Sequence, residues 1–282
     1  MRKTSRKTVS AVIAALMLCC SELTGVGADG LSLLPSFSEI AVQADTDIMK
    51  KYPLLLKLFN VPDWQCYGKK IYFSCDSTGR QTTVLSSSYR QKEWDMMWNS
   101  LSEHAVPMPA ERRILLFRIK ASSQTRLDCQ YAAILAPGVM AKYSNFPSGT
   151  PFRCDYAGIP DELRQRMPSG QFAAAGLPRI NKAPYEQIIF FCAAISCTAE
   201  KMFLRGEIHF TDSTQSGEMP VIFKKSLTAL LIQRGGISPE EAIRFASSFT
   251  FRLQKNKLFF ETGELPAAMT TATEHHETES TL

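Results

Sequence analysis

Short stretches in which apolar and polar residues alternate dominate the chain between residues 64 and 137. They are rich in β-branched and aromatic residues, and they are separated by Gly, Asp, Ser and Pro, which favour turns. This pattern predicts a mainly β protein, an antiparallel sandwich or barrel-like fold with a few short helices. The expected strands lie within residues 64–68, 69–75, 81–89, 112–121 and 127–137.

One helix interrupts these strands. Residues 91–105 place Trp94, Met97, Trp98 and Leu101 at helical spacing on one face. Two tryptophans on one stripe can form a platform for a ligand. Such a stripe more often packs against a sheet, and we interpret it in that way.

The C-terminal third contains two further helical signals. Residues 220–236 read as a strand that leads into a short helix, which a pair of glycines ends. A second helix begins after that pair, because Ser238 fits the N-cap and Pro239 the first helical position. Glu241 then completes a capping box with Ser238.

A hairpin with its turn across Gln254 to Lys257 is expected to follow this helix. A lone helix and hairpin bury too little surface to be stable alone. Residues 237–262 should therefore dock, either extending the main sheet or covering one of its edges. A second interpretation is that the adjacent Phe259 and Phe260 point to opposite faces, which leaves one aromatic ring exposed for a partner.

The first 28 residues carry an export pattern. Four basic residues precede an apolar run, and the segment ends in Val-Gly-Ala, which predicts a secretory signal peptide cleaved after Ala28. The alternative is lipid attachment at Cys19 or Cys20, although Leu18 stands where lipoprotein signals usually have a small residue. No other segment approaches the ~18 apolar residues of a membrane-spanning helix, so no transmembrane segment is expected.

These patterns divide the chain into five parts. A signal peptide (1–28) precedes a lead-in segment (29–62), a β-rich core domain (63–236), a docked helix plus hairpin extension (237–262) and a disordered tail (263–282). Cleavage after Ala28 removes four of the 32 Lys and Arg residues and one of the 27 Asp and Glu residues, so the net charge falls from +5 to +2. Because no basic stripe remains, we expect no nucleic-acid partner.

Six cysteines remain after cleavage, and an even count in an exported chain favours disulfide bonds. A dithiol redox site normally has two residues between its cysteines, whereas Cys192 and Cys197 have four. The four histidines do not complete a zinc site at finger-like spacing. We therefore expect three local bonds of about 2 kcal/mol each. They join Cys66 to Cys75, Cys129 to Cys154, and Cys192 to Cys197 across a turn in Ala-Ala-Ile-Ser.

No nucleophile, phosphate-loop or metalloprotease motif is present in the sequence, so we predict no catalytic residue, metal or cofactor. An exported hydrolase would have to recruit His104 or His209 as its base. That alternative requires one of them to lie within about 3 Å of a Ser or Cys side chain in a cleft. A binding function predicts that both histidines are solitary.

Taken in order, several motifs resemble the invasion-associated locus B family of exported bacterial proteins. They span residues 63–234 and include Trp64 with Cys66 and Cys75, "ILAPGVM" at 134–140, "CAAISCTA" at 192–199 and "PVIFKKSLTALL" at 220–231. The sequence departs from the family pattern at Ser196, where Gly is usual, and lacks a residue between Pro137 and Gly138.

The resemblance implies a small β-rich domain in the periplasm or at the cell surface, associated with host-cell entry and without established catalytic residues. Together with the export signal, it predicts a disulfide-stabilised interaction protein that is periplasmic, extracellular or outer-membrane associated. Its partner would be a protein of the envelope or host surface. The alternatives are the hydrolase that uses His104 or His209, and an accessory component of an envelope secretion apparatus.

Overall fold

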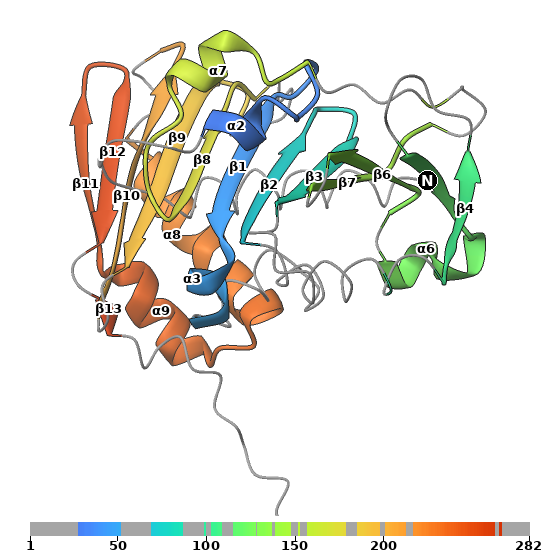
Figure 1. Ribbon diagram of the computed structural model, residues 1–282. Coiled ribbons are helices and arrows are strands. Elements are labelled where there is room, and N and C mark those ends of the chain that lie inside the picture. Colours follow the sequence, from blue (N-terminus) through green and yellow to red (C-terminus); the bar gives the residue numbers. More distant parts are fainter. Residues whose placement is uncertain are drawn as a thin grey trace, which may run out of the picture.

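The computed structural model describes residues 28–51, 69–86, 99, 103–108, 115–127, 129–136, 139–147, 152, 157–178, 185–197, 201–212, 217–262 and 265–266. Their strands form one open antiparallel sheet of 13 strands, on which the helices pack (Figure 1). The prediction of a mainly β, antiparallel protein is confirmed. The expected sandwich or barrel is wrong, because all the described strands belong to this single sheet.

The strand order is β11-β12-β10-β9-β8-β1-β2-β3-β7-β6-β5-β4, and β13 pairs with the start of β10. The strands in chain order are β1 (Ile40–Asp45), β2 (Lys70–Cys75), β3 (Gln81–Ser86), β4 (Ala105–Met108), β5 (Leu115–Ile119), β6 (Tyr131–Ala136), β7 (Val139–Ser144), β8 (Phe172–Gly176), β9 (Ile188–Cys197), β10 (Lys201–Phe210), β11 (Phe249–Gln254), β12 (Lys257–Thr262) and β13 (Leu265–Pro266). The helices are α2 (Ala28–Leu31), α3 (Thr46–Lys51), α6 (Ala121–Leu127), α7 (Asp161–Gln165), α8 (Met219–Leu230) and α9 (Pro239–Ser247), and a π-helical turn (Leu231–Gly235) follows α8.

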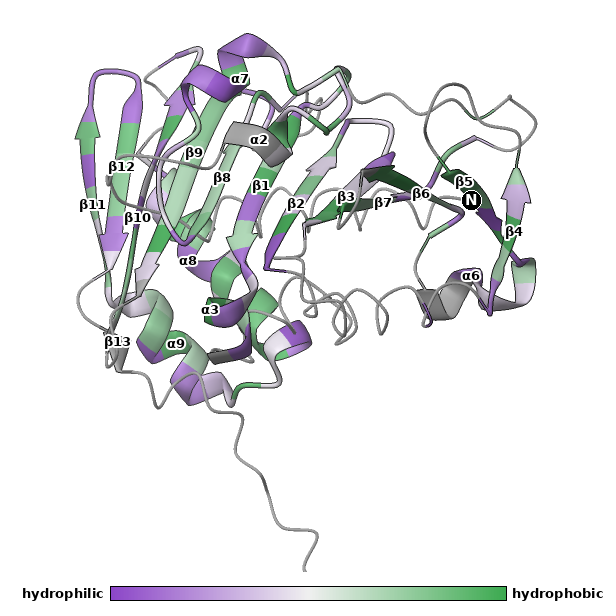
Figure 2. Ribbon diagram, in the orientation of Figure 1, coloured by the Kyte–Doolittle hydropathy of each residue, from purple (hydrophilic) through white to green (hydrophobic). Residues whose placement is uncertain are grey.

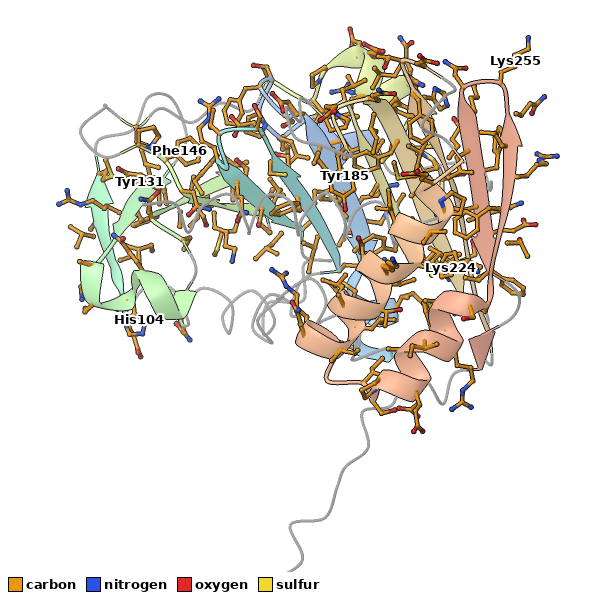
Figure 3. The ribbon with its side chains drawn as sticks, turned by 180° about the vertical axis from the view of Figure 1, so that it is seen from behind. His104, Tyr131, Phe146, Tyr185, Lys224 and Lys255 are labelled. Atoms are coloured by element: carbon orange, nitrogen blue, oxygen red, sulfur yellow. The ribbon has the colours of Figure 1, made fainter. Side chains whose placement is uncertain are left out.

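The helices α8 and α9 pack on one face of the sheet, which we call the helix face (Figures 1 and 3). Phe223 of α8 lies between two strands there, with ring centroids 5.1 Å from Phe249 and 5.0 Å from Phe260. Hydrophobic and hydrophilic bands alternate along β11 and β12 (Figure 2), as expected for strands with one buried face. The hairpin thus contributes apolar side chains to the core under the helices.

The opposite face, which we call the outer face, is covered unevenly. Over the central strands, α2 and α7 contribute Leu31 and Leu163 to a buried cluster with Tyr72, Tyr143 and Phe190. Farther along the sheet, the outward positions of β10, β12 and β11 are mostly polar or charged. This difference leaves one end of the outer face open for a polar site.

The helix and hairpin expected in residues 237–262 are present and contact the main sheet. α9 begins at Pro239, and its N-cap Ser238 accepts a hydrogen bond from the Glu241 backbone N–H at 3.3 Å. The hairpin turns between Gln254 and Lys257, and β12 pairs along β10, so the segment extends the main sheet. A lone helix and hairpin are stable here because they share the sheet's core.

Two elements differ from the expectations. The lead-in segment contains β1, which pairs on both sides, with β2 and with β8, near the middle of the sheet. The strand expected at the start of residues 220–236 is wrong, because α8 begins at Met219. Met219, Phe223, Leu227 and Leu230 are buried at helical spacing, so tertiary packing selects the helix.

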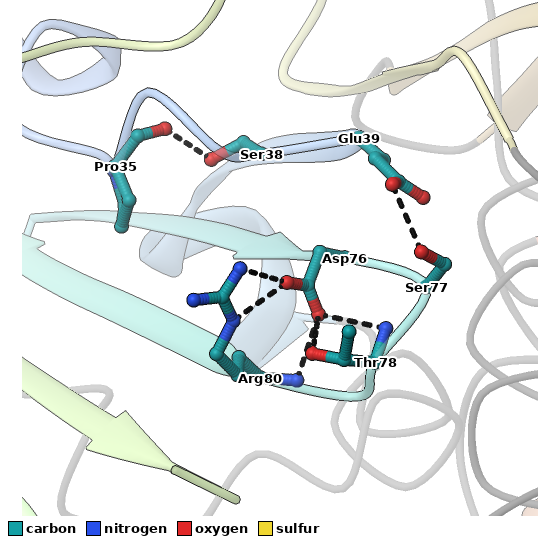
Figure 4. Close-up of polar contacts among 7 residues, drawn as sticks. All are labelled: Pro35, Ser38, Glu39, Asp76, Ser77, Thr78 and Arg80. Atoms are coloured by element: carbon teal, nitrogen blue, oxygen red, sulfur yellow. Dashed lines mark hydrogen bonds and ion pairs between the residues drawn. The ribbon is translucent and has the colours of Figure 1, made fainter. Parts of the chain in front are cut away.

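The turn between β2 and β3 is fixed by one buried carboxylate, Asp76, which is 4% exposed (Figure 4). Its Oδ1 accepts hydrogen bonds from the backbone N–H groups of Thr78 and Arg80, both at 3.0 Å, and from the Thr78 hydroxyl at 2.8 Å. Its Oδ2 accepts from Arg80 Nε at 2.7 Å. Arg80 in turn lies 3.9 Å above the Phe37 ring, so this Asp76 turn also holds the lead-in segment.

The amphipathic helix expected over residues 91–105 falls mostly outside the described residues, as do Cys66 and Cys154. In the part of the chain that the structure describes, no helix is long and apolar enough to cross a membrane. Ala28, the expected cleavage residue, is the first described residue and starts α2.

Candidate functional site

The expected bond between Cys192 and Cys197 does not form. Both cysteines belong to β9, where Cys192 faces Glu207 and Cys197 faces Met202 of β10. Five residues of extended strand separate the two Cα atoms by about 16 Å, whereas a disulfide needs Cα atoms within about 7 Å. The Ala-Ala-Ile-Ser segment lacks the Gly, Pro, Asn or Asp that a tight turn requires, so the strand continues through it.

The other expected bonds each include one cysteine outside the described residues. Cys75 is a buried free thiol, against the expected bond to Cys66. Burial, followed by the charges of Asp76 and Glu39, raises the Cys75 pKa to about 12. Cys129 is also buried, and no disulfide bond joins two described cysteines. The disulfide-stapled core is therefore not what holds the described strands together.

His104 meets the distance criterion for the hydrolase alternative. Its Nδ1 lies 3.1 Å from the hydroxyl oxygen of Ser123, in the first turn of α6. Ser123 is only 7% exposed. Among the described residues, no carboxylate accepts a hydrogen bond from His104. Figure 3 shows His104 at the end of the molecule opposite the hairpin tip that carries Lys255.

His209 lies on the outer face of β10 and contacts charged groups on both ring nitrogens. Arg166, which directly follows α7, places Nη2 2.8 Å from His209 Nδ1. On the other side, Nε2 lies 2.8 Å from Glu207 Oε1, a close contact that is not aligned as a hydrogen bond. The Arg166 guanidinium also stacks on Phe190, with Cζ 3.2 Å from the ring centroid. Neither histidine is thus solitary, so that expectation for a binding function is wrong. No Ser or Cys contact to the His209 ring is present among the described residues.

The strand register builds a polar surface beside His209. Phe190, His209 and Lys257 form one cross-strand row on β9, β10 and β12. Two residues closer to the start of β10, the next row on the same face contains Cys192, Glu207, Phe259 and Arg252. The third row on this face contains Ala194, Arg205, Glu261 and Thr250. Neighbours within a row lie about 5 Å apart and alternate rows share a face. Opposite charges therefore lie next to one another across four strands.

The second and third rows, apart from Ala194, form the floor of an open pocket with a cavity volume of about 730 Å³, and His209 lies beside it. Pro168, two residues after Arg166, forms part of the wall. Phe259 is half-buried in the floor, and the Arg252 guanidinium lies 5.0 Å from its ring centroid. Phe260 points instead to the helix face and is 2% exposed. The two rings thus point to opposite faces as expected, and Phe259 is half-buried rather than fully exposed; its use by a partner stays a prediction.

Burial keeps the Cys192 thiol of the pocket protonated and favours the neutral form of the neighbouring His209 imidazole. Burial, with the charge of Glu207, raises the pKa of Cys192 to about 12. Its Sγ lies 3.9 Å from Glu207 Oε1. Burial also lowers the pKa of His209, partly offset by its contact with Glu207. A protonated thiol is a weak nucleophile and metal ligand, so this arrangement favours binding over thiol chemistry.

Of the residues that line the pocket, the sequence analysis singled out Cys192, Phe259 and Phe260, but none of the charged residues. A signal for them exists in "FLRGEIHF", where Arg205, Glu207 and His209 alternate with apolar residues and so share one strand face. Arg166 and Pro168 carry no comparable signal, because only the path of the chain after α7 brings them there. In the part of the chain that the structure describes, no cluster of three His, Cys, Asp or Glu residues could hold a metal ion.

Comparison with known proteins shows a shared fold. No protein-family model and no curated protein matches the sequence. The structure is similar to two crystal structures of TP0453: form III, with a TM-score of 0.52, and form I, with a TM-score of 0.50. Each is 10% identical in sequence, and each match covers 86% of this chain and 95% of that chain. The resemblance to the invasion-associated locus B family stays a prediction.

Proposed function

We propose that this chain is an exported protein of the bacterial envelope or surface that binds a protein partner through the outer-face pocket. The observation that carries the proposal is the pocket itself, where charges of both signs surround a half-buried aromatic ring. Aromatic and Arg residues are enriched where proteins bind one another. The predicted signal peptide and the resemblance to exported, invasion-associated proteins support the location.

The charges of the pocket are available to a partner. Arg205, Arg252 and Glu261 are exposed, and within the described chain Arg205 and Glu261 have no side-chain hydrogen bond or ion pair to satisfy them. A protein segment that carries both acidic and basic side chains can complement this pattern. Such electrostatic complementarity gives specificity and fast association.

The test is capture of a partner from envelope and host-surface extracts by the mature chain. A pocket variant, Arg205→Glu with Arg252→Glu, reverses two pocket charges. Its matched control, Lys225→Glu with Arg244→Glu, makes the same change in net charge at exposed positions on α8 and α9. We expect the captured protein to be lost with the pocket variant and retained with the control, and the purified pair to show the same difference. Equal capture by both variants would remove the pocket from the proposal.

The second candidate is an exported serine hydrolase centred on Ser123, favoured by the 3.1 Å contact with His104. It predicts that a fluorophosphonate probe labels Ser123 in the full chain and that His104→Ala abolishes labelling. Ser123→Ala is the control for labelling elsewhere. An unlabelled Ser123 would exclude this candidate and leave the binding proposal unaffected, since the two sites lie at opposite ends of the molecule (Figure 3).

A further inference from the structure

The wall of the pocket depends on one arginine. Arg166 is two residues before the wall residue Pro168 and bridges from the end of α7 to the outer face of the sheet. Its guanidinium contacts the sheet at two points, the Phe190 ring and His209 Nδ1, at 3.2 Å and 2.8 Å. Its remaining ion pair, with Glu162 at 3.4 Å, stays within the α7 segment and is solvent-exposed. We call the contact among Arg166, Phe190 and His209 the clasp.

The chain after the clasp packs closely on β9. A Cβ added at Gly170 would lie 2.8 Å from the Ala194 Cβ and 3.1 Å from the Ile195 carbonyl oxygen. Residues 166–170 therefore lie directly on the strand that also carries Cys192. Because Pro168 and Cys192 line the same pocket, a displacement of this segment changes access to the thiol.

The clasp requires a neutral imidazole. A guanidinium can only donate hydrogen bonds, so His209 Nδ1 must carry a free lone pair to accept one. Its proton then resides on Nε2, beside Glu207. A second proton on the ring would occupy Nδ1 and place two cations 2.8 Å apart, which turns an attraction into a repulsion.

The groups around His209 direct this repulsion onto Arg166. Glu207, its neighbour on β10, attracts an imidazolium through Nε2. Lys257 on β12 repels one, and the Cys192 thiol on β9 is uncharged. Glu207 and Lys257 are held in paired strands, whereas Arg166 lies in a connecting segment. The protonated ring therefore stays with Glu207 and the arginine leaves.

We propose that the clasp is a proton-operated latch on the pocket: Arg166 holds the wall segment against the sheet beside Cys192 while His209 is neutral, and protonation of His209 releases the wall. The meaning of this opening for a partner rests on the proposed binding function, but the release is a property of the free chain. The lowered pKa of His209 agrees with a latch that stays closed at neutral pH and opens in acid.

The test measures access to Cys192 in the full chain without any partner. 2,2′-Dithiodipyridine, which modifies thiols in acid as well as at neutral pH, is applied to the wild type and to Arg166→Met at about pH 7.5 and at a pH below the midpoint of the His209 titration, because the pKa of His209 is lowered from its ordinary value. Mass spectrometry of the Cys192 peptide gives the rate. Comparing two proteins at one pH cancels the effect of pH on the reagent.

We expect Arg166→Met to be modified several-fold faster than the wild type at the higher pH and equally fast at the lower pH. Removal of Arg166 also removes a charge that lowers the Cys192 pKa, which would slow modification, so a faster rate reports opening of the wall. Arg244→Met on α9 is the control and should match the wild type at both values. Equal rates for wild type and Arg166→Met at the higher pH, or a ratio that does not change with pH, would overturn the latch.

A second measurement keeps the latch falsifiable if Arg166→Met is poorly folded. ¹⁵N spectra of the wild type in acid titrations report the protonation of His209 directly, and amide signals of residues 166–170 report the wall. We expect both sets to change with the same midpoint. Wall signals that stay constant while His209 titrates would overturn the latch, whereas loss of partner binding in the pocket variant tests the proposed function alone.

Discussion

Two arginines in this molecule stack on a phenylalanine ring but differ in the second group that they contact. Arg80 and Arg166 both stack on a phenylalanine, at 3.9 Å from Phe37 and 3.2 Å from Phe190. Arg80 completes its contacts with Asp76, a buried carboxylate that accepts from several donors. Arg166 completes its contacts with His209, a neutral ring.

The partner decides whether such a contact is permanent or conditional. The Asp76 carboxylate accepts from donors of its own turn as well as from Arg80, so the Asp76 turn does not depend on an imidazole. An imidazole gains a proton in mildly acidic solution. The same guanidinium–aromatic geometry thus serves as a fixed joint in the β2–β3 turn and as a releasable one beside the pocket.

The largest effect is expected at the fixed joint. Asp76→Ala removes the acceptor of three hydrogen bonds at Oδ1 and leaves Arg80 without its ion pair. Breaking a buried pair in this way costs about 3 kcal/mol. Urea unfolding measures the loss, and Glu186→Ala, at an exposed carboxylate, is the control with an expected change below about 0.5 kcal/mol. A loss as small as the control's would show that the turn does not depend on Asp76.

A matched pair of variants separates the two joints directly. Arg80→Met and Arg166→Met each remove a half-exposed guanidinium from a phenylalanine ring, with an expected cost of about 1 kcal/mol at neutral pH. Below the lowered pKa of His209 the cost of Arg80→Met should persist, whereas that of Arg166→Met should vanish because the clasp has opened. Parallel losses at both pH values, measured by urea unfolding, would make the two joints equivalent.

The pH dependence of the wild type follows from the lowered pKa of His209. The unfolded chain, with an ordinary His pKa of about 6.5, binds a proton before the folded chain does. The contribution of His209 to stability is therefore complete above about pH 6.5 and is lost as the pH falls toward the folded-state pKa. His209→Gln, which keeps a neutral acceptor, should unfold with a flatter pH dependence between about pH 7 and about pH 5. An unchanged slope would assign the dependence to other groups.

The sequence predicted the fixed elements better than the site. The start of α9 at Ser238 and the hairpin turn after Gln254 follow from local chemistry, namely a capping box and a short polar turn, and both are confirmed. β1 was missed because its six residues are strand-forming only when β2 and β8 pair on either side. Propensity is a weak guide where tertiary pairing decides.

The cysteines show why composition misled the prediction of the site. An even number of cysteines in an exported chain indicates that disulfide bonds can form, but it does not indicate which thiols are close. The strand register sets the position of each thiol. Cys192 and Cys197 are close in sequence and far apart in β9 because extended chain separates residues by about 3.3 Å each. The clasp has the opposite character: Arg166 and His209 are 43 residues apart and in contact.

The smallest changes in stability are expected for the solvent-exposed contacts beside the Asp76 turn and the clasp. Ser77→Ala removes an exposed 2.9 Å hydrogen bond to Glu39, and Glu162→Ala removes the exposed 3.4 Å ion pair to Arg166. Solvent competes for both contacts, so each change should cost at most about 0.5 kcal/mol. The two should nonetheless differ in one respect. Glu162 contacts Arg166 of the clasp, so Glu162→Ala should slightly increase the rate of Cys192 modification at neutral pH. Ser77→Ala should leave that rate unchanged, because Ser77 contacts only the region of the Asp76 turn. A rate that rises equally in both variants would show that the two joints are coupled through the sheet, and the comparison between a fixed and a releasable joint would then fail.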